Sequence, residues 1–178
     1  MKSRKKHLYP LFTVLLGLST FLLSTTAVKA SKPIYGYLEP VTLITQQITL
    51  TAKLDTGAET ASISAKNILL YEINGQEYAS FTVSHPELEQ PIHYNLPIVR
   101  HARIKKRAGE HTQKNRHHSR PVVRIPIHFD GKPHHIMVNL TDRSHFSTPM
   151  LLGRKALKKL NAVVDSTKKN TLLQKTDS

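Results

Sequence analysis

The chain has 178 residues, with 26 Lys and Arg, 12 Asp and Glu, 11 His, no Cys and a formal net charge of +14 at pH 7. This length suits one compact domain with appendages. The absence of Cys excludes a disulfide scaffold, a thiolate zinc site, a Cys nucleophile and a lipid anchor on Cys, and no GxxxxGK[ST] motif provides a P-loop for ATP.

Residues 1–30 have the three parts of a secretory signal peptide. A basic cluster at residues 2–6 precedes an uncharged, mostly apolar run from Leu8 to Val28, and small residues stand at positions −3 and −1 of a cleavage after Ala30. The run is also just long enough for an uncleaved membrane anchor, but Gly17 and several Ser and Thr residues favour cleavage. We therefore expect an exported protein, periplasmic in a Gram-negative source, that touches a membrane only if this segment stays uncleaved.

Short strand signals dominate residues 31–165, which we expect to fold as one domain. Residues 41–53 are rich in Thr, Ile, Leu and Val, which are common in strands. Asn74-Gly75 lies between two apolar runs and predicts a β-hairpin that includes residues 72–83.

Residues 100–120 interrupt this pattern with eight Lys and Arg residues, one acid and almost no apolar side chains. We expect a mobile basic loop between two strands there. After it, Pro121–Phe129 alternates apolar and polar residues, and Asp130-Gly131 predicts a turn into a strand over His135–Leu140.

The C-terminal part of the chain contains the one predicted helix, over Arg154–Leu160, where Leu157 and Leu160 lie three positions apart. Ala162–Asp165 is predicted to form a last short strand, and the polar residues 166–178 a flexible tail. Many short strands with one late helix indicate a mainly β fold, either a small barrel or a sandwich.

One stretch, Ala52–Ser62, combines residues that can carry chemistry. An apolar run leads to Asp55 at a sharp turn, where Gly57 permits an unusual backbone conformation and leaves space beside the carboxylate. Thr56 can hydrogen-bond across a neighbouring turn. A carboxylate held at the base of a cleft can act as a general base on water, although an Asp-Thr-Gly triplet alone also fits an ordinary surface turn.

A second motif, Leu151-Leu152-Gly153-Arg154, follows about a hundred residues later and directly precedes the predicted helix. The two motifs in this order resemble the retropepsin family, the single-lobe aspartic proteases. The resemblance implies a closed acid-protease barrel with one short C-terminal helix. It assigns catalysis to Asp55, Thr56 and Gly57, and structural support to Leu152, Gly153 and Arg154. It also implies an ion pair between Glu59 and Arg154.

The chain is most similar to one bacterial branch of that family, the RimK-associated retropepsin-like proteins, which are also labelled ATP-dependent zinc proteases. The resemblance covers about Lys32–Asp165, which is nearly the whole chain after the predicted signal peptide, and further segments carry it, namely Ile104–Arg107, Arg120–Val123 and Leu140–Arg143. Adjacent His pairs such as His134-His135 are poor chelates, because neighbours on a strand point to opposite faces. We therefore expect no metal and no cofactor.

Aspartic protease chemistry needs two carboxyl groups that share a proton, since like charges about 3 Å apart cannot both ionise. The chain has a single Asp-Thr-Gly. We therefore expect a homodimer in which the two copies of Asp55 meet at a two-fold axis. Asp142 is the alternative second acid, although it is better suited to pairing with Arg143 or to capping a turn.

The basic loop at residues 100–120 indicates how a substrate could be held. Its cations would attract an anionic chain, so we expect a peptide or protein substrate, with Asp- and Glu-rich peptides fitting best. The residues assigned to substrate binding are Ala58, Glu59, Arg103, Lys105, Lys106 and Arg107. A solvated loop that only maintains solubility is the alternative. The loop has no interleaved aromatic residues and the chain has no Trp, which argues against nucleic acid.

Three functional classes follow from these features. The expected one is an exported aspartic endopeptidase that hydrolyses peptide bonds with an Asp dyad. The second is a non-catalytic envelope module that binds anionic ligands through the basic loop. The third is a zinc hydrolase that uses His residues as ligands.

Overall fold

The computed structural model describes residues 31–104 and 118–174. The predicted signal peptide and residues 105–117 of the predicted basic loop lie outside the described residues. The strands are β1 (Ile34–Gly36), β2 (Leu38–Leu43), β3 (Ile48–Asp55), β4 (Ala61–Ser64), β5 (Lys66–Ile73), β6 (Gln76–Val83), β7 (Ile92–Ile104), β8 (His118–Phe129), β9 (Lys132–Thr141), β10 (Met150–Gly153) and β11 (Val163–Asp165). The helices are α1 (Arg154–Lys159) and α2 (Thr171–Gln174). Neither of these two helices is long and apolar enough to cross a membrane.

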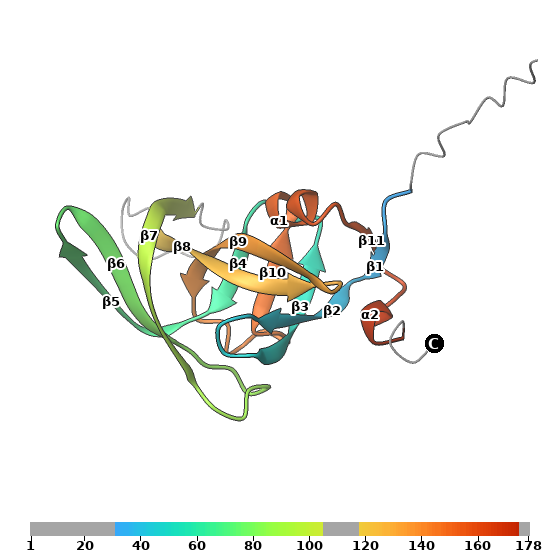
Figure 1. Cartoon of the computed structure of the whole chain (residues 1–178), viewed down its shortest axis with the longest axis horizontal. Helices are drawn as coiled ribbons and strands as arrows, with labels where there is room; N and C mark the ends of the chain where they lie inside the picture. Colours follow the sequence, from blue (N-terminus) through green and yellow to red (C-terminus); the bar gives the residue numbers. More distant parts are fainter. Residues whose placement is uncertain (1–30, 105–117, 175–178) are drawn as a thin grey trace, which may run out of the picture. The chain divides into compact units, whose positions relative to one another are not determined.

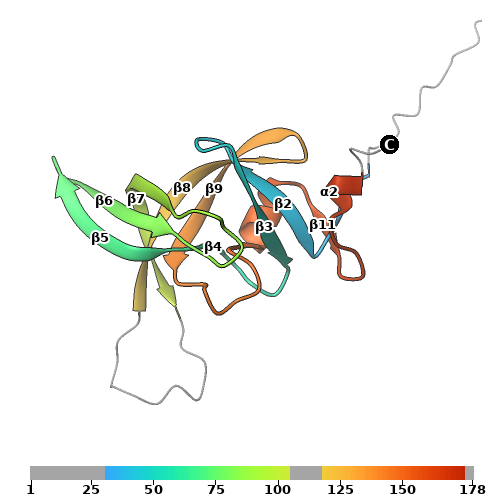
Figure 2. The same cartoon turned by 90° about the horizontal axis from the view of Figure 1, so that it is seen from below.

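Nine strands form one sheet in the order β2-β3-β10-β4-β9-β8-β7-β6-β5. An additional pairing of β2 with β8 closes the first six of these strands into a barrel, and β7, β6 and β5 continue the sheet beyond it (Figures 1 and 2). Strands β1 and β11 form a separate parallel pair. The predicted mainly β class and closed barrel are therefore confirmed.

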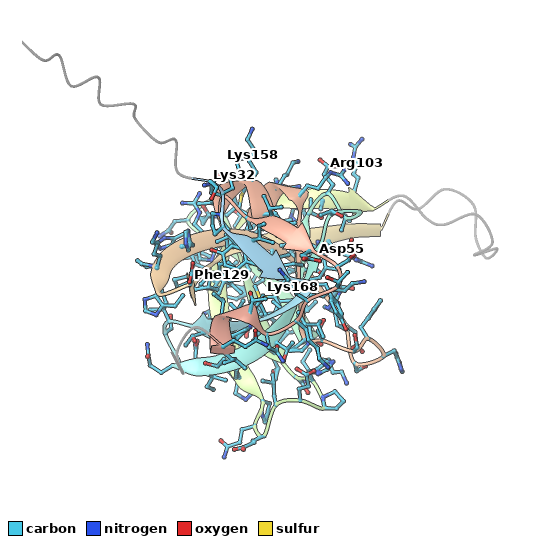
Figure 3. All side chains as sticks on the ribbon, turned by 90° about the vertical axis from the view of Figure 1, so that its right-hand side faces the viewer. Lys32, Asp55, Arg103, Phe129, Lys158 and Lys168 are labelled. Carbon is cyan, nitrogen blue, oxygen red and sulfur yellow. The ribbon has the colours of Figure 1, made fainter. Side chains whose placement is uncertain are left out.

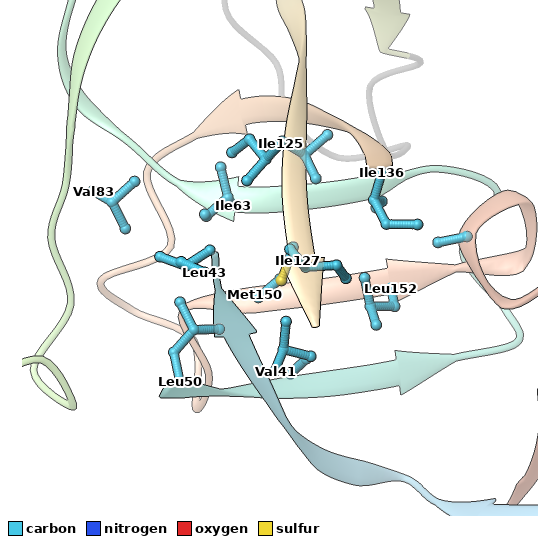
Figure 4. Close-up of a cluster of buried hydrophobic side chains, with 14 of the residues drawn as sticks. Val41, Leu43, Leu50, Ile63, Val83, Ile125, Ile127, Ile136, Met150 and Leu152 are labelled. Carbon is cyan, nitrogen blue, oxygen red and sulfur yellow. The ribbon is translucent and has the colours of Figure 1, made fainter. Parts of the chain in front are cut away.

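The core fills the barrel with aliphatic side chains from alternate strand positions (Figure 4). In β2, for example, Val41 and Leu43 are fully buried while their neighbours are partly exposed. Ile125 and Ile127 in β8 repeat the pattern. Each such side chain contributes on the order of 1.5–3 kcal/mol through removal from water, and the alternation fixes which face of each strand points inward.

Both predicted hairpin turns are present. Asn74 and Gly75 have φ values of 50° and 78° between β5 and β6, and Asp130 and Gly131 have φ values of 49° and 68° between β8 and β9. Positive φ at both central residues matches the right-handed twist of the flanking strands, which is why Asn-Gly and Asp-Gly are favoured in two-residue hairpins.

The predicted basic loop is shorter than expected, because β7 and β8 run into it. Arg103 pairs with Ser119, and Ala102 pairs with Arg120. Ala102 is buried between exposed His101 and Arg103, so the alternation of a strand continues to this point. Charged side chains on the outer face do not interrupt a strand, and the density of Lys and Arg concealed this alternation.

The predicted flexible tail is wrong for residues 166–174, which pack against the domain and include the second helix, α2. The backbone N–H of Tyr37 donates to Lys168 O at 2.9 Å, and the N–H of Asn170 donates to Leu38 O at 2.7 Å. The buried carboxylate of Glu39 then accepts hydrogen bonds from the first residues of α2. Polar composition indicated a solvated tail, but these polar atoms bind a buried acid instead.

Candidate active site

Parallel pairing of β3 with β10 brings the two sequence motifs together. The register places Leu152 beside Leu54 and Gly153 beside Asp55. Both leucines are almost completely buried, so the core holds the ends of the two strands side by side. Asp55 therefore lies at the carboxyl end of β3, next to the start of α1 (Figures 1 and 3).

The turn after β3 fixes one oxygen of the Asp55 carboxylate. Oδ1 accepts hydrogen bonds from the backbone N–H of Gly57 at 2.9 Å and of Ala58 at 3.2 Å. A side chain at Gly57 would place its Cβ 3.2 Å from that oxygen, so glycine leaves room for the carboxylate, as expected. The second oxygen, Oδ2, lies 3.5 Å from the Lys53 ammonium, and 26% of the Asp55 side chain is exposed. This arrangement leaves an ordered carboxylate that a water molecule can reach.

Thr56 does not have the expected hydrogen bond within this chain. Its side chain is exposed, and its hydroxyl has no partner among the residues that the structure describes. The carbonyl oxygen of Thr56 accepts a hydrogen bond from the Arg154 side chain of the second motif at 3.1 Å.

The predicted ion pair between Glu59 and Arg154 is wrong. Glu59 pairs with Lys155, at 2.7 Å between Oε1 and Nζ, and the hydrogen bond and charge of Lys155 hold the pKa of Glu59 below its usual value. Arg154 instead donates from Nη1 to the carbonyl oxygens of Thr56 at 3.1 Å and Gly57 at 2.9 Å. Arg154 therefore braces the turn that follows β3 through its backbone.

Gly153 supports the same turn by close contact. A Cβ at this position would lie 2.6 Å from Thr60 O and 2.8 Å from Ala58 O. The N–H of Arg154 donates to Ala58 O at 2.8 Å, so a loop carbonyl satisfies one of the free N–H groups at the start of α1. The structural support assigned to the second motif is thus explained by backbone packing.

Asp55 lies between two surface pockets. One has a volume of about 480 Å³ and is lined by Lys53, Asp55, Gly57, Ala58, Arg143, Phe146, Ser147 and Leu151. The other has a volume of about 370 Å³ and is lined by Tyr37, Lys53, Leu54, Asp55, Thr56, Val164 and Ser166. An extended ligand that crosses Asp55 could occupy both.

Arg143 is a residue of the site that sequence reasoning missed. Its side chain is 4% exposed, donates from Nε to Thr148 O at 3.1 Å and from Nη1 to Ser62 Oγ at 3.1 Å, and stacks 4.6 Å from the centre of the Phe146 ring. Burial lowers the pKa of the Arg143 guanidinium, and the charge of Asp55 opposes that shift. From the Thr-Asp-Arg segment, the sequence suggested Asp142 as a site residue and Arg143 only as a partner for its charge.

Asp142 does not line either pocket around Asp55. It is exposed, and its Oδ1 accepts a hydrogen bond from the backbone N–H of Ser144 at 2.8 Å. This hydrogen bond lowers the pKa of Asp142. Asp142 therefore caps a turn, which is one of the two roles that the sequence favoured for it, and it does not line the pockets at Asp55 as a second acid would.

The basic residues assigned to substrate binding are only partly described. Arg103 is exposed on β7, whereas Lys105, Lys106 and Arg107 lie outside the described residues. Ala58 lines the larger of the two pockets at Asp55 and Glu59 does not. Across residues 31–104 and 118–174, no group of three or more His, Asp or Glu side chains is arranged to hold a metal ion.

Comparison with known proteins places this site in a family. Residues 34–175 match the family model of the retropepsin-like aspartic endopeptidase RimB. A protein from Desulfotalea psychrophila (strain LSv54 / DSM 12343) named "Probable alpha-L-glutamate ligase" is 32% identical over 109 residues, which are 60% of this chain and 22% of that protein. The chain therefore spans about a fifth of this relative's length.

A solved structure has the same fold. The crystal structure of Lpg0085, a protein with unknown function (DUF785) from Legionella pneumophila subsp. pneumophila str. Philadelphia 1, matches with a TM-score of 0.67 and 39% identity. The match covers 80% of this chain and 99% of that one. With the family model matched across the whole barrel and both motifs in contact, the chain belongs to the RimB-like family of retropepsin-like aspartic endopeptidases.

Proposed function

We propose that this chain is an exported aspartic endopeptidase that hydrolyses peptide bonds with Asp55. The observation that carries the proposal is the Asp55 carboxylate itself. One oxygen is fixed by two backbone N–H groups, and the side chain remains partly exposed between two pockets. A general base must be both held in place and reachable by water, and Asp55 meets both conditions.

The reaction needs a second carboxyl group, and we propose that a second copy of the chain supplies it. In such a dyad the ionised Asp55 takes a proton from water while the water oxygen attacks the peptide carbonyl carbon, and the protonated partner donates to the carbonyl oxygen. As the intermediate collapses, the carbonyl oxygen returns its proton to the partner carboxylate, the C–N bond breaks, and the amine nitrogen takes the proton that Asp55 had accepted from water. The exposed Thr56 hydroxyl remains available to a neighbouring copy.

Acidic peptides are the proposed substrates. Lys53 and Arg143 line the larger pocket at Asp55, and no Asp or Glu other than Asp55 is among its lining residues. Arg103 is exposed near the end of β7, and Lys105, Lys106 and Arg107 follow it in the sequence. Because cations in a pocket raise the local concentration of anionic chains, a peptide rich in Glu or Asp would be captured faster than a neutral one. The name of the relative, a glutamate ligase, fits this choice by association only.

The experiment uses the chain from Ser31 onward and compares the wild type with Asp55→Asn. Both are incubated with Glu-rich and matched Gln-rich peptides, and products are measured by mass spectrometry. We expect Asp55→Asn to retain the wild-type melting temperature and to lose at least 10³-fold in kcat, on the order of the loss when a member of a catalytic unit is removed. Asp142→Asn is the matched control and should keep full activity, because that carboxylate only caps a turn.

The same assay tests the other two functional classes. Full turnover by Asp55→Asn contradicts the proposal. Activity that a chelator removes and zinc restores favours a metal hydrolase. No hydrolysis by the wild type, together with salt-sensitive binding of polyglutamate, favours an anion-binding module. Sedimentation of the active sample at several concentrations shows whether activity follows the dimer.

A further inference from the structure

The guanidinium of Arg143 has one edge that no residue of the described chain uses. A guanidinium carries five N–H donors. Nε and Nη1 donate to Thr148 O and Ser62 Oγ, and the described residues provide no hydrogen-bond partner for Nη2. In the described part of the chain, the side-chain nitrogen or oxygen atom that is both fully buried and without a hydrogen-bond partner is Asn139 Oδ1. Nη2 of Arg143 also lacks a partner but is not such an atom, so it is not fully enclosed. Arg143 lines the larger pocket at Asp55, which is the space that a substrate would occupy, and Nη2 is the part of its guanidinium left to donate to a ligand there.

The charge of Arg143 is also uncompensated by a direct ion pair. No carboxylate of the described residues lies within 4.0 Å of its nitrogen atoms. A buried cation without a directly paired anion is unfavourable for folding; the charge of Asp55 offsets part of this cost, and the charge of Arg120 adds to it. A cation held in this way at the edge of a pocket is positioned to act on negative charge that enters or develops in the pocket.

Neighbouring residues hold the guanidinium in one orientation. Ser62 is buried in β4, and Thr148 is anchored by its own hydrogen bond to Met150 O at 2.9 Å. The Phe146 ring covers one face of the guanidinium, and the carbonyl oxygen of Phe146 accepts a hydrogen bond from Nε2 of buried His85 at 3.0 Å. Donors fixed in advance in a partly enclosed site stabilise developing charge far better than donors that must reorient.

We propose that Arg143 is a catalytic residue that binds the oxygen of the scissile peptide carbonyl. The inference rests on the proposed function, since it takes Asp55 as the base. When the water oxygen attacks the carbonyl carbon and Asp55 takes the water proton, the electron pair of the C=O bond moves to the carbonyl oxygen. The free edge of Arg143 stabilises that negative charge. The pair returns as the C–N bond breaks, and the leaving nitrogen takes the proton from Asp55. The partner carboxyl of the proposed dyad protonates this oxygen after the charge has begun to form and takes the proton back as the intermediate collapses, so Arg143 and the partner act on the same oxygen in turn.

The test combines variants of Arg143 with chemical rescue in the same peptide assay. We expect Arg143→Ala to lower kcat by about 10²- to 10³-fold, the usual effect of removing an oxyanion donor, with KM changed less than about threefold. Added guanidinium at millimolar concentration should restore at least tenfold in kcat. Arg143→Lys keeps a charge but loses the planar fork, so its kcat should stay low. Arg124→Ala, an exposed arginine on β8, is the matched control and should not change kcat.

Ser62→Ala provides a milder variant that keeps the cation and removes one of its anchors. We expect a several-fold lower kcat and a melting temperature lowered by a few degrees at most, because one buried hydrogen bond is lost. If Arg143→Ala does not fold, wild-type kcat in both Arg143→Lys and Ser62→Ala overturns the proposal. A raised KM with normal kcat, seen for Glu peptides but not for Gln peptides, also overturns it and assigns Arg143 to a substrate side chain. If Asp55→Asn loses all activity while the Arg143 variants keep wild-type activity, the proposed function stands and the role of Arg143 is overturned.

Discussion

Asp55 and its neighbours show how much of a site depends on contacts between backbone and side chain. Oδ1 is held by N–H groups of its own turn, which the sequence did not predict, and Gly57 does not have a positive φ, unlike Gly75 and Gly131. The sharp turn at Asp-Thr-Gly was itself predictable from the sequence. The partner of Glu59 was not, because Arg154 and Lys155 are adjacent cations and charge sign cannot decide between them. The first turn of α1 places Lys155 beside Glu59 and Arg154 over the loop carbonyls.

Gly153→Ala tests whether close backbone packing holds the turn that carries Asp55. The new Cβ would meet Thr60 O at 2.6 Å and Ala58 O at 2.8 Å, and Ala58 O is already bound to the N–H of Arg154. We expect the free energy of unfolding to fall by about 1–3 kcal/mol, the usual cost of overpacking. Activity should fall further than this instability explains, because the turn that holds Asp55 must shift. Urea denaturation and the peptide assay measure the two effects.

Gly75→Asn is the comparison for this variant. Gly75 has a φ of 78° and open space around a built Cβ, and Asn tolerates this conformation better than other residues. Its cost should stay within about 1 kcal/mol, with normal activity. Wild-type stability and turnover in Gly153→Ala would show that the turn does not need the glycine.

At the scale of elements, the two hairpins were predictable from the sequence. The C-terminal clasp, in which Glu39 of β2 binds Thr171 and Leu172 at the start of α2, was not. Asn74-Gly75 and Asp130-Gly131 encode their turns locally, so a short stretch of sequence is sufficient. The contact of β2 with α2 joins residues more than 130 positions apart. Nothing near Glu39 in the sequence indicates that its carboxylate is buried, and nothing in residues 166–174 indicates what they bind. Such long-range partners become visible only once the barrel is closed.

Glu39→Gln tests the clasp. The carboxylate accepts hydrogen bonds from Gly36 N at 2.6 Å, Thr171 N at 2.9 Å, Thr171 Oγ1 at 2.6 Å and Leu172 N at 3.0 Å. Glutamine keeps one acceptor oxygen but places an NH₂ group where the second carboxylate oxygen was. At least one of these N–H or O–H donors therefore loses its acceptor. We expect a loss of about 1–3 kcal/mol in the free energy of unfolding, measured by urea denaturation.

Hydrogen exchange locates the effect of Glu39→Gln. Amides of residues 168–173 should exchange faster than in the wild type, while those of the barrel strands change less. Glu89→Gln, an exposed acid, should leave both stability and exchange unchanged. Equal exchange in the tail of Glu39→Gln and of the wild type would mean that the clasp does not depend on the charge.

At the scale of the whole molecule, barrel closure assembles the site from three distant segments. Asp55 ends β3, Arg143 follows β9, and Arg154 begins α1. The fold class could be predicted because the alternation of apolar and polar residues indicates strands, and the order of the two motifs resembles that of a known barrel family. The position of Arg143 could not, because it depends on how the segment after β9 returns to β10 and on buried partners such as Ser62 and Thr148.

Two buried tyrosines make the stability of the domain sensitive to alkaline pH. Burial raises the pKa of Tyr94 to about 12. Burial and a hydrogen bond to Asp130 raise that of Tyr35. A tyrosine in the unfolded chain has a pKa of about 10. Above pH 10 the unfolded state therefore releases protons that the folded state keeps, so the free energy of unfolding falls as the pH rises.

Tyr94→Phe isolates one of these contributions. In β7 the Tyr94 ring stacks on Phe81 at 5.3 Å, and its hydroxyl donates to Gln46 Oε1 at 2.6 Å. The variant should lose some stability at neutral pH with that hydrogen bond, but its stability should fall less steeply than that of the wild type between about pH 10 and pH 12. Between about pH 7 and pH 9 both states keep the tyrosine proton, so the two stability curves should run parallel there. Urea denaturation across this range measures the slopes, and equal slopes at alkaline pH would mean that the Tyr94 hydroxyl titrates alike in the folded and unfolded states.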